Sequence, residues 1–324
     1  MLDLEDIHRF TSICFKRTAY GQDANPLISP LSILSVLFLL AEATQGKTKN
    51  EILNSIHCNL SNQDIQKLFE TSKACRTSNE IHIQKDIFDT LVPNFIQRFT
   101  GKICKTDDLT GLINFINTIS FESTWSKPFK DIDRDWFTNQ DGSKSRCQMM
   151  RRIERMYIEN QSFTGFIKSY TSADAFMALL PKEKNYDSLL RSIEECNFTQ
   201  LFNSAYPADV EIAMPQFESQ YETDLTNFLR DLGIHELFTE AADFSGMTSV
   251  HLRIEKILHE SQIKFSQIKT VAFAKTIATM DYGIDFEYDS RSVILNRPFI
   301  YAIMHFDSVT QQFIPVFVGV LNQL

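Results

Sequence analysis

The sequence lacks the features that mark several broad classes of protein. Lys and Arg number 32 against 41 Asp and Glu, so the formal net charge is −9 and no excess of positive charge is available to neutralise phosphates. Nucleic acid is therefore not an expected partner. The basic run 144–155 is interpreted as a solvated surface segment. The most apolar stretch, 27–41, is shorter than the roughly 20 residues needed to cross a bilayer, so no membrane contact is expected.

Motifs for catalysis and for metal binding are also missing. No G-x-S-x-G, P-loop, G-x-G-x-x-G or H-E-x-x-H segment occurs. The six cysteines form no C-x-x-C pair and no zinc-type spacing with histidine, which indicates reduced and mostly buried thiols. His259 and Glu260 are adjacent, but neighbours on a strand point to opposite faces, so they make a poor catalytic pair. We predict no enzyme activity, no metal site and no cofactor.

The rest of the composition is typical of a folded protein. Of 324 residues, 43% are hydrophobic and 12% aromatic, which is enough for a sizeable core. No linker, repeat or low-complexity segment divides the chain, so one domain over 1–324 is expected. The N-terminus starts with acidic residues and has no apolar signal core, so we expect the cytoplasm.

Hydrophobic periodicity predicts both helices and strands, without regular alternation, and favours an α+β fold. Segment 59–80 is polar and is predicted to be irregular. The predicted helices are 27–41, 45–57 and 224–234, and the predicted strands are 112–121, 175–181, 210–217, 297–307 and 314–321.

Residues 269–290 contain an unusual alternation. From Thr270 to Ala278 every second side chain is small, whereas the side chains between them are large or charged. A strand with one small face can enter a packed layer without overpacking, which costs about 1–3 kcal/mol per misfit. An acidic stretch, 281–289, follows. Taken alone, the alternation is also compatible with an ordinary edge strand.

Several segments resemble the serpin family in the same order along the chain. They are NPLISPLSILSVLFLLAEATQGKTKNEIL (25–53), INFINTISFESTWSKPF (113–129), ADVEIAMPQFESQYETDLTNFLRDLGIHELFTEAADFSGM (208–247), RPFIYAIMHFD (297–307) and VFVGVL (316–321). The resemblance covers most of 25–321. It implies an α+β serpin-like fold with a large central mixed sheet, a second sheet barrel and surrounding helices. The trimmed chain is similar to the intracellular serpins of poxviruses.

The alternating segment lies where serpins carry the reactive-centre loop, here about 267–295. The resemblance implies that a protease cleaves this loop, which then inserts into the main sheet and traps the protease as an acyl-enzyme. The implied hinge consists of Lys269, Thr270, Val271, Ala272, Phe273, Ala274, Lys275 and Thr276.

Several positions for the cleaved bond remain open. Counting forward from the hinge gives Gly283, and counting back from Pro298 gives Glu287. Asp285 lies between them and follows Tyr-Gly-Ile, so the segment resembles a caspase tetrapeptide. Asp281 is a further candidate.

The resemblance also implies residues that control opening of the sheet. Ser29, Ser32, Asn117 and His259 match a polar cluster behind the insertion point, where buried polar groups should hydrogen-bond one another. Trp125 matches the place where the top of the sheet first parts. These residues are expected to control opening and not to catalyse a reaction.

The chain also departs from the family pattern. Gln267, Ile268 and Lys269 replace the usual acids and glycine of the hinge, and Lys269 lacks the backbone freedom of glycine. The region 60–95 looks shortened, with helices and an edge strand expected to be missing and a helix expected to end at 101–103.

The resemblance implies a monomeric suicide pseudosubstrate of a host serine or caspase-like cysteine protease, acting in apoptosis or inflammation. The alternative is a non-inhibitory serpin that binds a partner protein through its surface.

Overall fold

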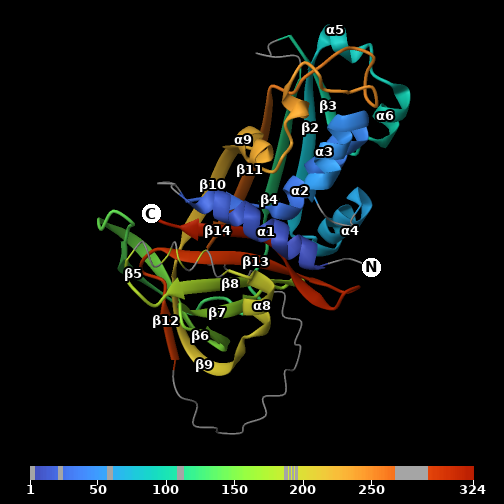
Figure 1. Cartoon of the computed structure of the whole chain (residues 1–324). Helices are drawn as coiled ribbons and strands as arrows, with labels where there is room; N and C mark the ends of the chain where they lie inside the picture. The colour runs from blue at the N-terminus through green and yellow to red at the C-terminus, as the bar shows by residue number, and fades with distance from the viewer. Residues whose placement is uncertain are drawn as a thin grey trace.

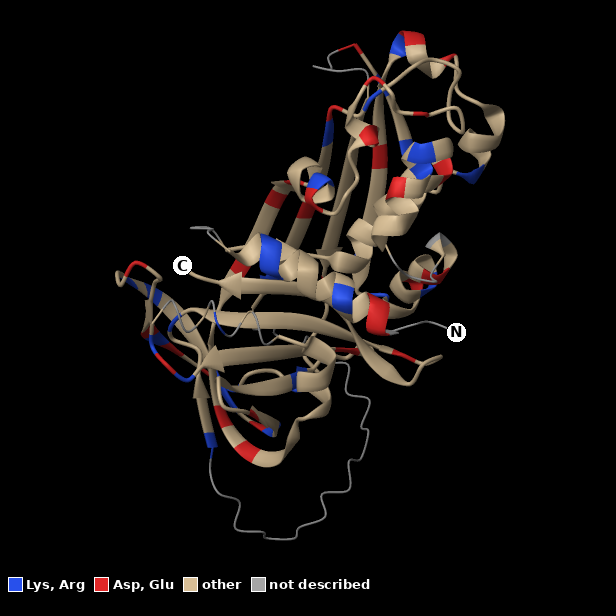
Figure 2. Cartoon of the chain, viewed as in Figure 1, with Lys and Arg blue, Asp and Glu red and all other residues tan. Residues whose placement is uncertain are grey.

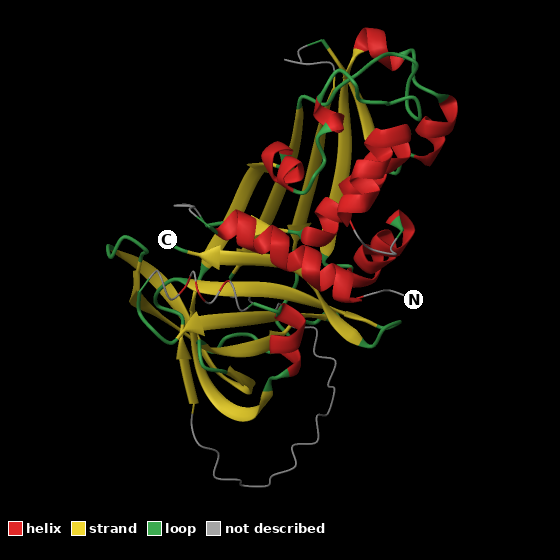
Figure 3. Ribbon diagram, in the orientation of Figure 1, coloured by secondary structure: helices red, strands yellow, loops and turns green. Residues whose placement is uncertain are grey.

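The computed structural model describes residues 4–20, 25–56, 61–107, 113–185, 189, 191, 193, 196–266 and 291–324. Its strands form two sheets, and most helices pack beside the upper sheet in the view of Figures 1 and 3. None of the described helices is both long enough and apolar enough to cross a membrane. The helices among the described residues are α1 (Leu4–Ala19), α2 (Pro30–Ala43), α3 (Gly46–Ile56), α4 (Asn62–Ser72), α5 (Lys85–Phe88), α6 (Pro93–Arg98), α8 (Phe198–Asn203), α9 (Thr226–Asp231) and the 3₁₀ turn η1 (Glu236–Phe238).

In the described part of the chain, the upper sheet has five strands of mixed direction. β11 and β4 are parallel neighbours, and each has an antiparallel strand on its outer side. Along β4, buried and half-buried residues alternate without exception, so one face covers the core and the other is partly open. The spatial order is β10 (Phe217–Asp224), β11 (Lys256–Phe265), β4 (Ile113–Phe121), β2 (Cys75–Gln84) and β3 (Lys102–Thr106).

The lower sheet has nine strands among the residues that the structure describes, and β8 and β13 are buried along almost their whole length. Such strands are covered on both faces and give continuous apolar runs in the sequence. The predicted C-terminal strand pair is confirmed, because β13 and β14 are antiparallel neighbours. The main path runs β1 (Leu27–Ile28), β14 (Gln312–Leu321), β13 (Phe299–Asp307), β8 (Asp174–Pro181), β7 (Phe163–Ser169), β6 (Lys144–Glu159), β9 (Tyr206–Pro215) and β12 (Arg291–Ile294), and β5 (Asp131–Thr138) pairs with β6.

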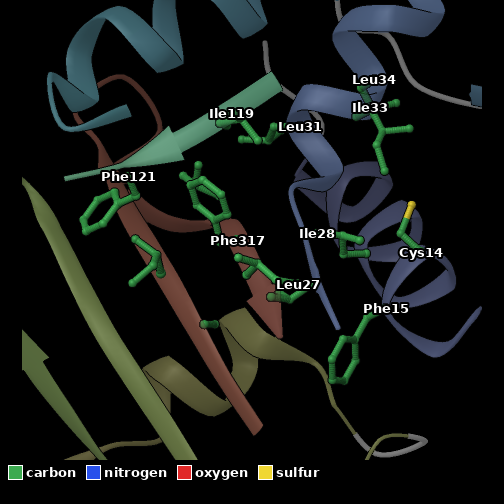
Figure 4. Close-up of a cluster of buried hydrophobic side chains, with 14 of the residues drawn as sticks. Cys14, Phe15, Leu27, Ile28, Leu31, Ile33, Leu34, Ile119, Phe121 and Phe317 are labelled. Atoms are coloured by element: carbon green, nitrogen blue, oxygen red, sulfur yellow. The ribbon is translucent and has the colours of Figure 1, made fainter. Parts of the chain in front are cut away.

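Helix α2 is the central helix of the fold. Ser29 caps it by accepting a hydrogen bond from the Ser32 amide, and Pro30 occupies the first helical position. Every residue of α2 except Glu42 is buried, as expected for a helix that is apolar all round. Figure 4 shows the core beside its first turn, where side chains of α1, β1, α2, β4 and β14 meet. The two sheets therefore share one apolar core.

Segment 60–107 differs in part from the prediction. The sequence predicts irregular structure over 59–80, but this region contains α4, which starts with a capping box between Ser61 and Asp64, and most of β2. Helices α5 and α6 are also present, with only four and six residues. The edge strand that we expected to be missing is present as β3, at the position of the predicted helix end. The first half of β2 is polar and largely exposed, so it carries no apolar alternation to reveal it.

The basic run lies on β6, beside acidic residues of the neighbouring strand (Figure 2). Arg151 forms ion pairs with Asp133 and Asp135 of β5, and Arg152 pairs with Glu154 of its own strand. Part of the positive charge of the run is therefore offset within the sheet.

Candidate sheet-opening site

The predicted reactive loop falls on residues outside the described part of the chain. This applies to the hinge Lys269–Thr276 and to the cleavage candidates Asp281, Gly283 and Asp285. The structure does place the anchors of the loop. β11 ends at Phe265 in the five-stranded sheet, whereas β12 begins at Arg291 and pairs with β9 in the nine-stranded sheet. The segment between these anchors therefore connects one sheet to the other.

The line between β4 and β11 is here called the seam. These strands are parallel over eight residue pairs, from Asn114–Lys256 to Phe121–Ile263. A strand that follows β11 through a turn runs antiparallel to β11, and therefore also to β4. Such a strand could form antiparallel ladders on both sides of the opened seam.

The structure brings the four predicted cluster residues together behind the seam. Asn117 of β4 and His259 of β11 are register partners, and their Oδ1 and Nδ1 atoms are 2.6 Å apart. The Ser32 hydroxyl donates to the same Asn117 oxygen at 2.9 Å. The Ser29 amide donates to His259 Nε2 at 3.1 Å. All four side chains are 0% exposed, so these hydrogen bonds have no competition from bulk water.

The hydrogen bonds of His259 require the neutral ring. Because Nε2 accepts from the Ser29 amide, the ring proton lies on Nδ1, which donates to Asn117. A second proton on Nε2 would face the Ser29 N–H group and remove that hydrogen bond. Burial lowers the pKa of His259 to about 3. The ring is therefore uncharged at neutral pH.

The polar cluster extends further than the sequence indicated. The Asn117 amide donates to Asn79 Oδ1 of β2 at 2.7 Å, and Asn79 donates in turn to the Ser35 hydroxyl of α2 at 3.2 Å. The network thus crosses three strands and reaches two turns of one helix. Asn79 lies two and four residues before the buried Ile81 and Ile83 on β2, so period-two alternation could have placed it on the core face.

Insertion of a strand would have to break the link between Asn117 and His259. Neighbouring strands lie about 4.8 Å apart, so one additional strand would separate β4 from β11 by roughly 9.6 Å. The 2.6 Å contact cannot span that gap. The buried hydrogen-bonding groups would then need new partners. Small side chains on the inserted strand would leave space for these groups to rearrange above α2.

Trp125 lies at the end of β11 from which the predicted loop departs. Its side chain is 3% exposed and stacks on Tyr170, with ring centroids 4.2 Å apart. The indole Nε1 donates to the carbonyl oxygen of Ser266 at 3.3 Å, and Ser266 is the last described residue before the loop. Trp125 therefore holds the departure point of the loop against the lower sheet.

A buried ion pair that the sequence did not predict lies beside Trp125. Lys168 is 1% exposed, and its Nζ lies 5.3 Å from the Trp125 ring centroid and 4.7 Å from that of Phe129. The ammonium group pairs with Glu154 and donates to the Lys127 carbonyl oxygen at 2.6 Å. Burial lowers the pKa of Lys168, and Glu154 opposes that shift. A lysine and a glutamate on strands usually face solvent, so nothing in the sequence distinguished this pair.

Comparison with known proteins now identifies the family. A family model described as serpin (serine protease inhibitor) matches residues 5–106 and 94–322. The chain belongs to the serpin family. A serine protease inhibitor of Cyanea capillata is 22% identical over 88% of this serpin and 89% of the relative. The corticosteroid-binding globulin of Sus scrofa is also 22% identical, over 90% of this chain and 83% of the globulin. The family therefore includes relatives named for inhibition and for ligand binding.

Solved structures confirm the fold. The native state of tengpin, a thermophilic serpin, superposes with a TM-score of 0.81 at 22% sequence identity, over 100% of this chain and 95% of tengpin. The predicted α+β serpin fold is thus confirmed. The matching family is described by inhibition of proteases and not by catalysis, so family membership also supports the prediction that this protein is not an enzyme.

Proposed function

We propose that this serpin is a suicide inhibitor, in which loop cleavage is followed by insertion between β4 and β11. The single observation that supports this most directly is the seam. It is a parallel contact between strands of a five-stranded sheet, linked across its middle by the buried hydrogen bond between Asn117 and His259. β11 leads directly into the segment with one small face. The target protease supplies the nucleophile. This chain supplies the loop that is cleaved and the strand that traps the acyl-enzyme.

The acidic loop favours a target that cleaves after aspartate. Asp285 in Tyr-Gly-Ile-Asp would suit a caspase-like cysteine protease or an aspartate-specific serine protease, with Gly283 and Asp281 as the other cleavage positions. The similarity to trimmed poxviral serpins favours a host protease of apoptosis or inflammation. We place the protein in the cytoplasm as a monomer. Among the described residues, Cys14, Cys75, Cys104 and Cys147 are free thiols, which is compatible with a reducing compartment.

A second candidate function is protein or ligand binding without inhibition. Lys269 stands where the serpin hinge usually has glycine, and Phe273 stands where it usually has alanine. Both changes would slow insertion, and a slow serpin is cleaved as a substrate before it traps the protease. The corticosteroid-binding relative is an example of a serpin named for ligand binding.

The deciding experiment is a denaturing gel after incubation with caspases and serine proteases, with mass spectrometry of the released peptide. We expect a band at the summed mass of serpin and protease. Ala272→Arg places a long cation on the face that must pack, so it should be cleaved without forming that band. Phe273→Arg puts the same side chain on the opposite face and serves as the matched control, which should still form the band.

Two outcomes would overturn the inhibitor proposal. One is unchanged trapping by Ala272→Arg, and the other is clean cleavage of the wild type by every protease without a stable band. Thermal unfolding of the cleaved protein then shows whether the cleaved loop inserts. Insertion of a strand raises the unfolding temperature, whereas cleavage without insertion leaves it unchanged.

A further inference from the structure

Three potential metal ligands meet on the partly open face of the five-stranded sheet. Glu80 and His82 lie two residues apart on β2, and Cys104 of β3 is the register partner of His82. Residues two apart on a strand share a face, and register partners lie side by side. Asn79 points into the core, so its neighbour Glu80 points to the opposite, partly open face. The three side chains therefore form one group away from the polar cluster of the seam.

Two of the three distances between the ligand atoms are close to those around a tetrahedral ion. His82 Nε2 is 3.1 Å from Glu80 Oε2, and Cys104 Sγ is 3.6 Å from the same oxygen. Each of the three residues offers one ligand atom, and the three atoms all lie within 4.8 Å of one another. With metal bonds of about 2.1 Å to N or O and about 2.3 Å to S, a tetrahedral ion sets its ligand atoms about 3.4 Å apart for N and O and about 3.6 Å apart for S and O.

The group is reachable and chemically suited to a metal. The side chains of Glu80 and His82 are 27% and 29% exposed, and Cys104 is an unpaired, half-buried thiol. Glu80 Oε1 lies 3.8 Å from Lys102 Nζ, which leaves Oε2 as the oxygen turned to the other two ligands. Asn114 of β4 is the register partner of His82 on its other side, and its Oδ1 is buried without a hydrogen-bond partner among the described residues. Water bound to an ion at this face would bring a hydrogen-bond donor close to the Asn114 oxygen.

We propose that Glu80, His82 and Cys104 bind Zn²⁺, with water at the fourth position. Imidazole, thiolate and carboxylate are the donors that zinc takes in proteins, and an ion with three protein ligands keeps one open position. Binding releases the thiol proton of Cys104, and His82 coordinates through Nε2 with its proton on Nδ1. The ion joins the edge strand β3 to β2.

Sequence spacing did not indicate this site, because its ligands belong to no local motif. His82 and Cys104 are brought together only by the parallel pairing of β2 with β3. The expectation of no metal site was based on linear spacing, and that spacing carries no information about the pairing of strands.

Titration with Co²⁺ tests the site directly, because a thiolate–cobalt bond gives a charge-transfer band and a tetrahedral ion gives visible d–d bands. The full chain is reduced, freed of metal with a chelator, titrated with Co²⁺ and then with Zn²⁺. We expect one Co²⁺ per chain, both sets of bands, and their loss when Zn²⁺ displaces the cobalt. Cys104→Ser should lose the charge-transfer band. Glu80→Gln and His82→Gln should each weaken binding by at least about tenfold.

Cys147→Ser is the matched control. Cys147 is also half-buried, and its Sγ contacts the Asp135 carbonyl oxygen in the other sheet, so this variant should keep the full cobalt spectrum. Urea midpoints of the metal-free variants establish that each one folds. The proposal is wrong if the wild type gives no charge-transfer band, if Cys104→Ser retains it, or if Cys147→Ser loses it to the same extent.

Discussion

Acid should weaken the fold through His259, and the structure sets the size of the effect. The ring is neutral in the native state, with a pKa of about 3, whereas an unfolded chain has a histidine pKa of about 6.5. Between these values the unfolded state binds more protons than the native state. The free energy of unfolding therefore rises with pH across this window and falls as the solution is made acidic.

The linkage relation converts these pKa values into a stability change. Each pH unit inside the window changes the free energy of unfolding by at most about 1.4 kcal/mol. Between pH 8 and pH 5, protonation of His259 in the unfolded state should remove about 2 kcal/mol from the free energy of unfolding. Above about pH 8 the histidine is neutral in both states, so its contribution is constant there.

His259→Gln isolates this contribution from all other titrating groups. Its side-chain oxygen can accept from the Ser29 amide and its NH₂ can donate to Asn117, so the two native hydrogen bonds are reproduced without a titrating ring. Urea unfolding of both proteins at pH 8 and pH 5 gives the comparison. We expect the wild type to lose about 2 kcal/mol more than the variant between these pH values.

The outcome that refutes this reasoning is an equal loss in both proteins. It would mean that His259 already carries its proton in the native state at pH 5, and that the ring orientation inferred from the Ser29 contact is wrong.

Two further substitutions test the buried polar groups. Asn117→Ala leaves His259 and Ser32 without their acceptor, so we expect a loss of about 1–3 kcal/mol for each unsatisfied group, read from the urea midpoint. Glu154→Gln removes the partner of the buried Lys168 and should cost about 3–5 kcal/mol. Glu183→Gln breaks an exposed pair with Arg191 and should change stability by less than about 1 kcal/mol; a similar cost for both glutamates would contradict the argument from burial.

The parts of the fold that the sequence predicted are those with strong periodicity. The strand predicted at 112–121 is β4, which alternates in burial from Ile113 to Phe121, and the C-terminal pair is apolar almost throughout. The start of α2 was also predictable, because Ser29 and Pro30 supply both the cap and the first helical residue. In these elements local sequence and tertiary burial agree, so the local pattern was sufficient.

The missed parts depend on contacts between distant segments. The first half of β2 is polar and becomes a strand because it pairs with β4, which no local pattern shows. Lys168 is buried because it packs on Trp125 and Phe129 and pairs with Glu154. The polar cluster of the seam was found only through resemblance to serpins. Asn117 and His259 are 142 positions apart, and each alone has the character of an ordinary strand residue.

Chain connectivity divides the five-stranded sheet into two blocks of strands. Only six residues, 107–112, join β3 to β4, and β2 lies between those two strands, so the three form one tethered block. β10 and β11 form a second block, connected through α9 and η1. Across the seam no short connection exists, because β4 and β11 are separated along the chain by everything from Glu122 to Glu255. Expansion of the sheet would therefore separate these two blocks of strands along the seam, whose position follows from the order of the strands in the chain. The hydrogen bonds of the polar cluster would hold the two blocks together until the seam opens.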